Sequence, residues 1–455
     1  MKLHIYGALL AYKKRRSARF HMPGHKASRR WFRLFRDAAL DVTELSATDC
    51  LENPDGAIAE AQADIARLLG ARRSYILTDG ATAGVFALLY IVRKRGGKVL
   101  VSRNSHKSVY NACALLGVEP VIVQNTERDG VLLPPTSADI ETALRKDAQI
   151  GAVLLTSPDY FGNVANYEAI SKVCRRYEKL FFVDGSHGAY LCFDPDESGL
   201  YAGRFADAWV DSSHKTMPTL TQGALLNVGD ESLVPAAEEA LDIFRTTSPS
   251  YPIMASVEYG VKLLEEQGAD LIDVVKRELA LLKARFKKRG IAFYGGSRTL
   301  VLAVDFAQAG VSAQAAQEEL EHRGIFAELN DGRYVLFYFS PLTPPRQLAR
   351  LERGVRAVLR MRALKGSFTH THGYASGVKK FGYLTAFSLP AETVPLEEAV
   401  GRVAARNAGI TPPCYPVVVA GEQITEEAAK ELAGARHTFG VADGKISVIH
   451  IGGRK

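Results

Sequence analysis

The chain has 455 residues, of which 47% are hydrophobic and 24% are charged. These proportions are ordinary for a soluble globular protein, and they exclude collagen, coiled coils and general disorder. The net charge of +7 arises from 57 basic and 50 acidic residues, a small imbalance for this length. Basic residues cluster at 13–16 and 29–36, where a solvated helix face is the commoner explanation and a nucleic-acid patch is the alternative. The longest uncharged apolar run, 80–92, is too short to cross a bilayer, so we expect no membrane span.

The cysteines and histidines do not show the spacing of metal ligands. Five cysteines lie at positions 50, 113, 174, 192 and 414. Without a Cys-x-x-Cys pair they predict neither a zinc ribbon nor a disulfide framework, and they indicate a reducing, cytoplasmic compartment. We therefore expect no metal site.

The predicted elements begin with a helix over 3–16, a loop at 20–26, an acidic loop at 41–55 and a helix at 57–69. Strands are predicted at 74–78, 99–101, 120–124, 151–155, 180–184, 208–211 and 223–228, with helices at 82–95, 107–116, 137–147 and 166–178. Nearly continuous apolar strands between helices are typical of an α/β fold with a mainly parallel central sheet flanked by helices.

The second half of the chain shows two smaller patterns after a long helical stretch. Helices are predicted at 253–289, 312–323, 344–362, 396–406 and 425–433, strands at 299–305 and 333–339, and a linker at 366–382. We divide the chain into an N-terminal helix and arm (1–55), a large domain (56–260), a small α/β domain (261–365), and a linker with a C-terminal domain (366–455).

Two charged residues stand at the ends of predicted strands. Lys215 follows strand 208–211 in a stretch rich in apolar and hydroxyl side chains. A buried lysine has a lowered pKa and becomes an amine nucleophile, which suits a Schiff base with pyridoxal 5'-phosphate (PLP); the alternative is an amine that reaches solvent. Asp184 ends strand 180–184 and could hold the pyridine nitrogen of PLP in its protonated form, or simply cap the next helix.

Two further segments follow strands of the same sheet. The stretch Thr78-Asp-Gly-Ala-Thr-Ala-Gly84 opens a helix and could bind a phosphate group, although an ordinary tight turn has the same composition. It is neither a Walker A motif nor a dinucleotide fingerprint. His106 could stack on a planar cofactor or move protons, but a lone loop histidine is often incidental. Because all four groups follow strands, we expect them at one edge of the sheet.

In this combination the chain resembles the PLP-dependent, fold-type I Orn/Lys/Arg decarboxylases, in a short form without a wing domain. The motifs that carry this resemblance are Phe20-His-Met-Pro-Gly-His-Lys26, Arg103-Asn-Ser-His-Lys-Ser108, Thr156-Ser-Pro-Asp-Tyr-Phe-Gly162, Ser212-Ser-His-Lys-Thr216, Leu220-Thr-Gln222, Thr247-Ser-Pro-Ser-Tyr251, Pro395-Leu-Glu-Glu-Ala-Val400 and Gly421-Glu-Gln-Ile424. Together they cover nearly the whole chain.

The resemblance implies a role for each candidate residue. Lys215 matches the Schiff-base lysine, Asp184 the pyridine partner and His106 the ring-stacking histidine. The other implied cofactor-binding residues are Gly80, Ala81, Thr82, Ser186, His187, Ser212 and His214. The implied reaction is decarboxylation of arginine, lysine or ornithine to an amine and CO2, in polyamine biosynthesis. Another PLP reaction, such as transamination or aldol cleavage, is the alternative.

The resemblance also implies a homodimer with active sites at its interface, and no nucleic-acid or membrane partner. Thr247 and Ser248 match a segment that approaches the partner subunit's cofactor. An acidic group must meet the distal cation of a basic substrate, and the loop residues Glu44, Asp49, Glu52 and Asp55 are candidates, either within the subunit or across the dimer. A solvated acidic loop is the alternative.

Two departures from the family pattern leave the substrate open. The chain has Asp184-Gly-Ser-His187 where the family usually has Asp-Glu-Ala-His, so Gly185 and Ser186 are unusual. The tail has Pro412-Pro-Cys-Tyr-Pro416 in place of Pro-Pro-Gly-Ile-Pro, which places Cys414 and Tyr415 in a loop expected near the substrate entrance.

Overall fold

The structure is a computed structural model that describes residues 1–15, 19, 21–23, 25–28, 39–123, 125–361 and 377–450. The predicted linker lies mostly outside the described residues, as do Phe20 and Gly24 of the first family motif. Within the described part of the chain, no helix is both long and apolar enough to span a membrane.

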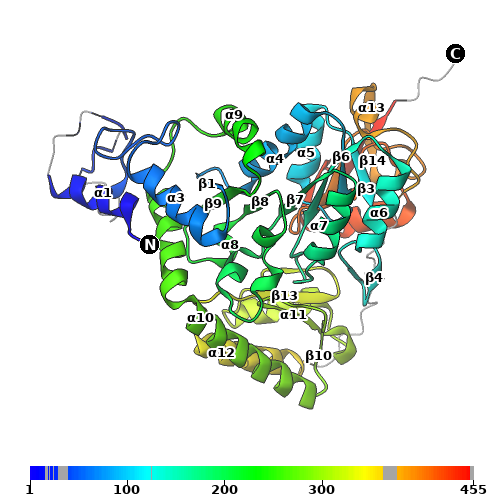
Figure 1. Cartoon of the computed structure of the whole chain (residues 1–455). Helices are drawn as coiled ribbons and strands as arrows, with labels where there is room; N and C mark the ends of the chain where they lie inside the picture. The colour runs from blue at the N-terminus through cyan, green and yellow to red at the C-terminus, as the bar shows by residue number, and fades with distance from the viewer. Residues whose placement is uncertain are drawn as a thin grey trace.

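A seven-stranded sheet with the order β1-β9-β8-β7-β6-β2-β3 forms the centre of the molecule (Figure 1). Its strands are β1 (Arg73–Leu77), β2 (Lys98–Ser102), β3 (Pro120–Val123), β6 (Ile150–Thr156), β7 (Leu180–Asp184), β8 (Ala208–Asp211) and β9 (Ala224–Val228). Neighbouring strands are parallel except at β9, which is antiparallel to both β1 and β8. Only a four-residue helix and a loop separate β8 from β9, which is too little for the crossover that a parallel pair requires.

Helices cover both faces of this sheet, which confirms the predicted α/β fold. They are α3 (Ala57–Leu69), α4 (Ala81–Arg95), α5 (Lys107–Leu116), α6 (Ser137–Lys146), α7 (Tyr167–Arg176), α9 (Val234–Phe244) and α10 (Tyr251–Lys288). Along β7, Phe181 and Val183 belong to one buried apolar cluster and Phe182 to another, on the opposite face. This burial on both faces explains the nearly continuous apolar strands. Helix α9, which has a proline in its first turn, was not predicted from the sequence.

A smaller unit follows α10 and faces the central sheet. It consists of the antiparallel sheet β10-β11-β13-β12 and two helices. Its elements are β10 (Ala292–Phe293), β11 (Val301–Asp305), α11 (Ala313–His322), β12 (Leu329–Asn330), β13 (Tyr334–Tyr338) and α12 (Pro345–Val358). The predicted boundary at residue 260 falls inside α10, a single 38-residue helix. The domain boundaries therefore stay predictions.

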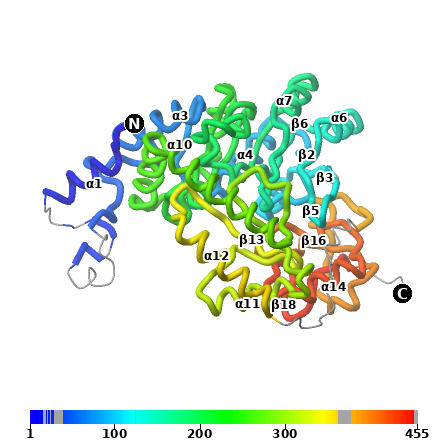
Figure 2. The backbone as a smooth tube through the Cα atoms, turned by 90° about the horizontal axis from the view of Figure 1, so that it is seen from below, coloured from blue at the N-terminus to red at the C-terminus, as the bar shows by residue number. Residues whose placement is uncertain are grey.

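The C-terminal unit packs beside α5 and the small unit, at the side of the molecule away from α1 (Figure 2). It contains α13 (Tyr383–Ser388), β14 (Ala391–Pro395), β15 (Ala408–Ile410), β16 (Pro416–Val418), α14 (Glu426–Gly434), β17 (Thr438–Phe439), β18 (Val441–Ala442) and β19 (Lys445–Ile449). The predicted helix at 396–406 is wrong. Gly401 has a φ of +81°, which ends helical geometry, and Val403 and Ala404 instead form β-bridges to Gln423 and Val448.

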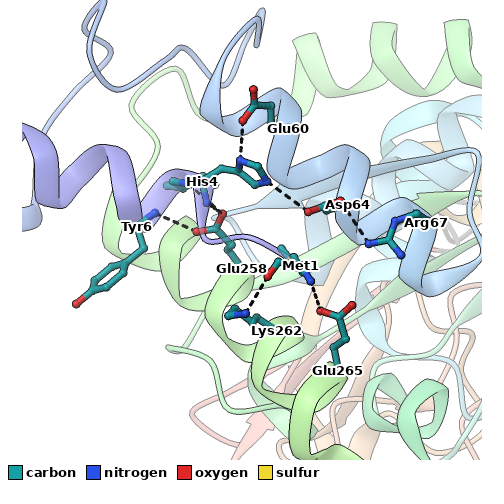
Figure 3. Close-up of polar contacts among 10 residues, drawn as sticks. Met1, His4, Tyr6, Glu60, Asp64, Arg67, Glu258, Lys262 and Glu265 are labelled. Atoms are coloured by element: carbon teal, nitrogen blue, oxygen red, sulfur yellow. Dashed lines mark hydrogen bonds and ion pairs between the residues drawn. The ribbon is translucent and has the colours of Figure 1, made fainter.

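The first helix, α1 (His4–Lys14), docks against α10 and α3. Figure 3 shows the carboxylate of Glu258, on α10, directed at the first turn of α1. It accepts hydrogen bonds from the backbone N–H groups of His4, Ile5 and Tyr6, with N···O distances of 2.5, 3.0 and 3.0 Å. The side chain of Glu258 therefore caps a helix that is more than 250 residues away in the sequence.

Candidate active site

A cavity of about 170 Å³ lies at the edge of the central sheet where the parallel strands end. All ten predicted site residues line it: Gly80, Ala81, Thr82, His106, Asp184, Ser186, His187, Ser212, His214 and Lys215. The structure therefore brings these ten residues together, whereas Thr247, Ser248 and the acidic-loop residues Glu44, Asp49, Glu52 and Asp55 are not among the residues that line this cavity. The chemical role of each one stays a prediction.

Lys215 reaches this cavity from α8 (Ser213–Thr216), the short helix that follows β8. Its Nζ lies 3.0 Å from Nε2 of His187 and 5.4 Å from the ring centre of Tyr160. Burial lowers the pKa of Lys215, while the negative charges of Asp184 and Glu328 partly oppose that effect. A larger fraction of neutral amine, the nucleophilic form, follows from this environment.

His187 is buried beside that amine. Its Nδ1 lies 3.3 Å from the carbonyl oxygen of Pro158, and the edge of its ring contacts Tyr160 with centroids 4.4 Å apart. Burial, followed by the charge of Lys215, lowers the pKa of His187 well below its ordinary value. A neutral imidazole can exchange a hydrogen bond with the lysine amine without adding a second positive charge.

Asp184 lies at the end of β7, with 3% of its surface exposed. Its Oδ1 accepts a hydrogen bond from the hydroxyl of Ser186, and the hydroxyl of Ser212 donates to Ser186 over 3.0 Å. The other oxygen, Oδ2, makes no hydrogen bond to any residue that the structure describes. A buried carboxylate with one free oxygen can accept a bond from a protonated ring nitrogen.

The start of α4 also lines the cavity. Gly80 precedes this helix with a φ of +73°, a conformation that favours glycine, and its N–H donates to the carbonyl of Gln222 over 3.0 Å. The N–H groups of the first helical turn, which include Ala81 and Thr82, have no earlier carbonyl in the helix to bind. With the helix dipole they can hold a phosphate group.

His214 also lines the cavity, and a hydrogen bond to the backbone holds its ring in place. Its Nδ1 lies 3.0 Å from the carbonyl oxygen of Gly223, the residue before β9. Burial lowers the pKa of His214 from its ordinary value. Because a carbonyl oxygen only accepts hydrogen bonds, Nδ1 carries the proton of the neutral ring and Nε2 is left as the acceptor.

His106 precedes the first residue of α5 and comes from the loop after β2. Its Nδ1 accepts a hydrogen bond from the backbone N–H of Ser108 (3.2 Å) and lies 2.8 Å from the Ser108 hydroxyl. Burial lowers the pKa of His106 to about 4, so the ring is neutral at neutral pH. This bonding fixes the tautomer and restricts rotation of the ring.

These features fit PLP. The cavity joins a helix N-terminus suited to the phosphate, a carboxylate with a free oxygen suited to the pyridine nitrogen, and a buried amine suited to the aldehyde carbon. Two further polar atoms, Thr156 Oγ1 and Asn104 Oδ1, are buried without a hydrogen-bond partner in the described structure. Such atoms rarely stay unpaired, so a polar ligand is expected to meet them.

Six other residues line the cavity but were not predicted as site residues: Val85, Asn104, Ser108, Thr156, Tyr160 and Pro413. Thr156 ends β6, so the rule that placed Asp184 could also have found it. Asn104, Ser108 and Tyr160 lie within motifs that were recognised. Pro413 belongs to the stretch 412–416, which was expected near the substrate entrance, but its place in the cavity wall depends on how the C-terminal unit docks.

In the acidic loop, Asp49 has a structural role. Its carboxylate accepts hydrogen bonds from the backbone N–H groups of Cys50, Asp55, Gly56 and Ile58, over 2.7 to 3.1 Å. Burial alone would raise the pKa of Asp49, but these bonds outweigh it and lower the pKa. Because one oxygen is bonded within the acidic loop and the other to the start of α3, Asp49 is a poor candidate for binding a substrate cation.

Comparisons with known proteins identify similar chains over nearly the full length. The family model of the Orn/Lys/Arg decarboxylase major domain matches residues 4–295 of the sequence. The family model of the Orn/Lys/Arg decarboxylase C-terminal domain matches residues 382–433. An uncharacterized Bacillus subtilis protein, YaaO, is 31% identical over 95% of this chain and 94% of its own length. An arginine decarboxylase of Halalkalibacterium halodurans is 29% identical over 93% of this chain and 91% of its own length.

Solved structures show the same fold. The constitutive lysine decarboxylase of Escherichia coli superposes with a TM-score of 0.79 over 99% of this chain and 82% of its own, at 22% sequence identity. At this identity the likeness concerns the fold alone.

Proposed function

Because this chain belongs to the Orn/Lys/Arg decarboxylase family, whose major-domain model spans most of it, we propose that it uses PLP to decarboxylate a basic amino acid to the corresponding amine and CO2. The observation that carries this proposal is one cavity that contains a buried amine, a buried carboxylate with a free oxygen, and a helix N-terminus. We further propose that this reaction belongs to polyamine biosynthesis, because the amines formed from arginine, lysine or ornithine carry more than one amino or guanidino group.

Each residue group of the cavity has a separate proposed role toward PLP. When bound, PLP supplies a ring that accepts the electrons released with CO2. Lys215 would hold the cofactor through its amine, Asp184 would keep the proton on the pyridine nitrogen, and the first turn of α4 would hold the phosphate. His106, neutral and fixed by Ser108, would cover the ring.

The proton that replaces the carboxyl group must come from a nearby acid. The amine of Lys215 lies in hydrogen-bond contact with His187, so a proton can pass between them without leaving the cavity. Tyr160 packs over the same amine and limits the access of water.

We propose that Glu328 receives the distal cation of the substrate. Glu328 is exposed and directly precedes β12, which pairs with β13. Strand β13 leads to the site, because Tyr338 at its end contacts the ring of His187 with centroids 5.7 Å apart. Its negative charge acts on Lys215, which supports its closeness to the reacting centre. A carboxylate whose charge reaches the amine without contacting it suits an ammonium or guanidinium group at the far end of a substrate side chain. The acidic loop remains the alternative.

We further propose a cytoplasmic homodimer with active sites at its interface. All five cysteines are free of disulfides, which supports a reducing compartment. Leu220 and Tyr259 are about half exposed, at 52% and 49%, and the N–H of Leu220 bonds to Ser256 on α10, near Tyr259. This apolar surface adjoins the loop that follows Lys215. Light scattering of the purified protein should give twice the mass of the chain, and a monomeric mass would refute the dimer.

A screen of the purified protein with added PLP across the standard amino acids tests the function. We expect CO2 and an amine from arginine, lysine or ornithine, and borohydride should fix the cofactor to Lys215. Lys215→Ala should lose both properties, whereas Lys172→Ala, which changes an exposed lysine, should retain them. Formation of a keto acid without CO2, or fixation at another lysine, would refute the proposal.

A further inference from the structure

The loop that carries His106 is held by the C-terminal unit on both sides of that histidine. Arg103, three residues before His106, forms an ion pair with Glu422, and its Nη2 donates to the carbonyl of Val417 over 2.7 Å. Immediately after His106, the backbone N–H of Lys107 donates to the carbonyl of Cys414 over 2.7 Å. We call these two contacts the clamp.

The first contact of the clamp is buried, and both terminal nitrogens of the Arg103 guanidinium take part in it. The side chains of Arg103 and Glu422 are 4% and 8% exposed. Burial alone would lower the pKa of Arg103, but the charge of Glu422 outweighs it and raises the pKa. The second oxygen of Glu422 accepts the N–H of Val419 over 2.9 Å. A buried ion pair contributes little net stability compared with apolar packing, so its value lies in fixing one arrangement.

The second contact places the C-terminal unit at the cavity itself. Lys107 is the first residue of α5, so its N–H has no acceptor within the helix and bonds to Cys414 instead. Pro413, the neighbour of Cys414, lines the cavity together with His106. The loop from 412 to 414 thus both forms a wall of the cavity and holds the backbone beside His106.

A separate contact joins the same two units at the opposite edge of the sheet. The carboxylate of Glu119 accepts hydrogen bonds from the N–H groups of Tyr383 and Leu384, over 2.8 and 2.9 Å. Glu119 precedes β3, whereas Arg103 follows the parallel strand β2, so the two contacts lie one strand length apart, roughly 15 Å. This contact provides a control that joins the units without touching the His106 loop.

From this arrangement we propose that the C-terminal unit positions His106 against the cofactor through the clamp. Arg103, Glu422 and the backbone N–H of Lys107 are positioning groups, because they act through His106. The proposal rests on the proposed function, since it takes PLP as the ligand that His106 covers. It gives the C-terminal unit a part in completing a site that otherwise belongs to the large domain.

Lys107→Pro tests the clamp with little disturbance of the fold. Proline is favoured at the first position of a helix, and His106, at φ −59° and ψ 146°, already has the backbone conformation that a following proline requires. The variant therefore removes the N–H bond to Cys414, and Lys107→Ala, which keeps that N–H, is its matched control. Arg103→Lys tests the other contact, since it keeps the charge and loses the second N–H group. Glu119→Gln is the control, because it weakens the contact between the large domain and the C-terminal unit without changing the clamp.

Four quantities should be measured for each variant: the PLP dissociation constant, the visible circular dichroism of bound PLP, hydrogen exchange of residues 104–109 without PLP, and the melting temperature. We expect Lys107→Pro and Arg103→Lys to weaken PLP binding at least tenfold, to change the dichroic band, and to speed exchange at least tenfold. Lys107→Ala and Glu119→Gln should keep the PLP dissociation constant and the exchange rate within twofold of the wild type and leave the dichroic band unchanged. Glu119→Gln should nevertheless lower the melting temperature.

The outcomes separate this inference from the proposed function. If the wild type gives no PLP signal, both fail. If the wild type binds PLP and neither Lys107→Pro nor Arg103→Lys changes its dichroism and affinity, the clamp alone is refuted. It is also refuted if Glu119→Gln weakens PLP binding as much as the clamp variants do, since the effect would then reflect general loosening. Should Arg103→Lys fail to fold, the pair Lys107→Pro and Lys107→Ala decides the question.

Discussion

Replacement of Glu258 by alanine should release α1 from the body of the molecule. An ordinary capping side chain costs about 0.5–2 kcal/mol when it is replaced by alanine. Glu258 is charged, is 0% exposed and serves three N–H groups, so we expect a larger cost of about 2–4 kcal/mol for the undocking of α1. The apolar side of the helix, with Ile5 and Leu9 each 1% exposed, should keep α1 attached most of the time.

Hydrogen exchange of the amides in α1 measures this effect directly. A cost of 2–4 kcal/mol corresponds to exchange about 30 to 1,000 times faster over residues 5–14 in Glu258→Ala. Glu258→Gln should give a smaller increase, because its carbonyl oxygen can still serve His4 and Ile5 while its amide group faces the N–H of Tyr6.

Glu266→Ala is the matched control on the same helix. Glu266 pairs with Lys262 one turn away and is half exposed, so its loss should cost only about 0.3–0.5 kcal/mol. The reasoning fails if exchange in α1 is the same in Glu258→Ala and the wild type, or if Glu266→Ala accelerates it equally.

Three further predictions concern the site and its surroundings. Burial raises the pKa of Asp211 to about 7. The contribution of the protonated Asp211 to the stability of the fold is therefore complete below pH 3.8 and is lost as the pH rises towards 7. The melting temperature of the wild type relative to Asp211→Asn should fall between pH 4 and 8, and a constant difference would contradict this. Ser186→Ala should move the visible absorption band of bound PLP, because Asp184 loses a hydrogen bond worth about 1.5–3 kcal/mol; an identical spectrum from pH 6 to 9 would count against the contact. Glu328→Gln should raise KM for the basic substrate at least tenfold with a smaller change in kcat, and a rise only in Glu52→Gln would favour the acidic loop instead.

Much of the site could be predicted because one rule governs it. In a mainly parallel sheet the carboxyl ends of the strands meet at one edge, so Asp184 and Lys215 could be placed together from the positions of their strands alone. The predicted bounds of β7, β8 and α5 agree with the structure residue for residue. Apolar runs bounded by polar residues carry this information locally.

The features that were missed depend on contacts between distant segments. Pro413 reaches the cavity only because the C-terminal unit docks beside α5. Around residues 396–406, apolar spacing suggested a helix, but Val403 and Ala404 are buried by pairing with Gln423 and Val448. The capping of α1 by Glu258 likewise has no signal in either segment. Tertiary contacts of this kind override local spacing.

The structure also gives a local reason for the two unusual residues after Asp184. A Cβ atom at Gly185 would lie 3.0 Å from Oδ1 of Asp211 and 3.3 Å from the carbonyl oxygen of Val210, so a side chain there requires this region to shift. Ser186, in turn, donates its hydroxyl to Asp184 and accepts one from Ser212. Both changes therefore act at the carboxylate expected to face the pyridine nitrogen, whereas a substrate's distal cation must extend away from the cofactor ring. We infer that Gly185 and Ser186 adjust how the chain holds its cofactor, and that the choice among basic amino acids is made elsewhere, by residues such as Glu328.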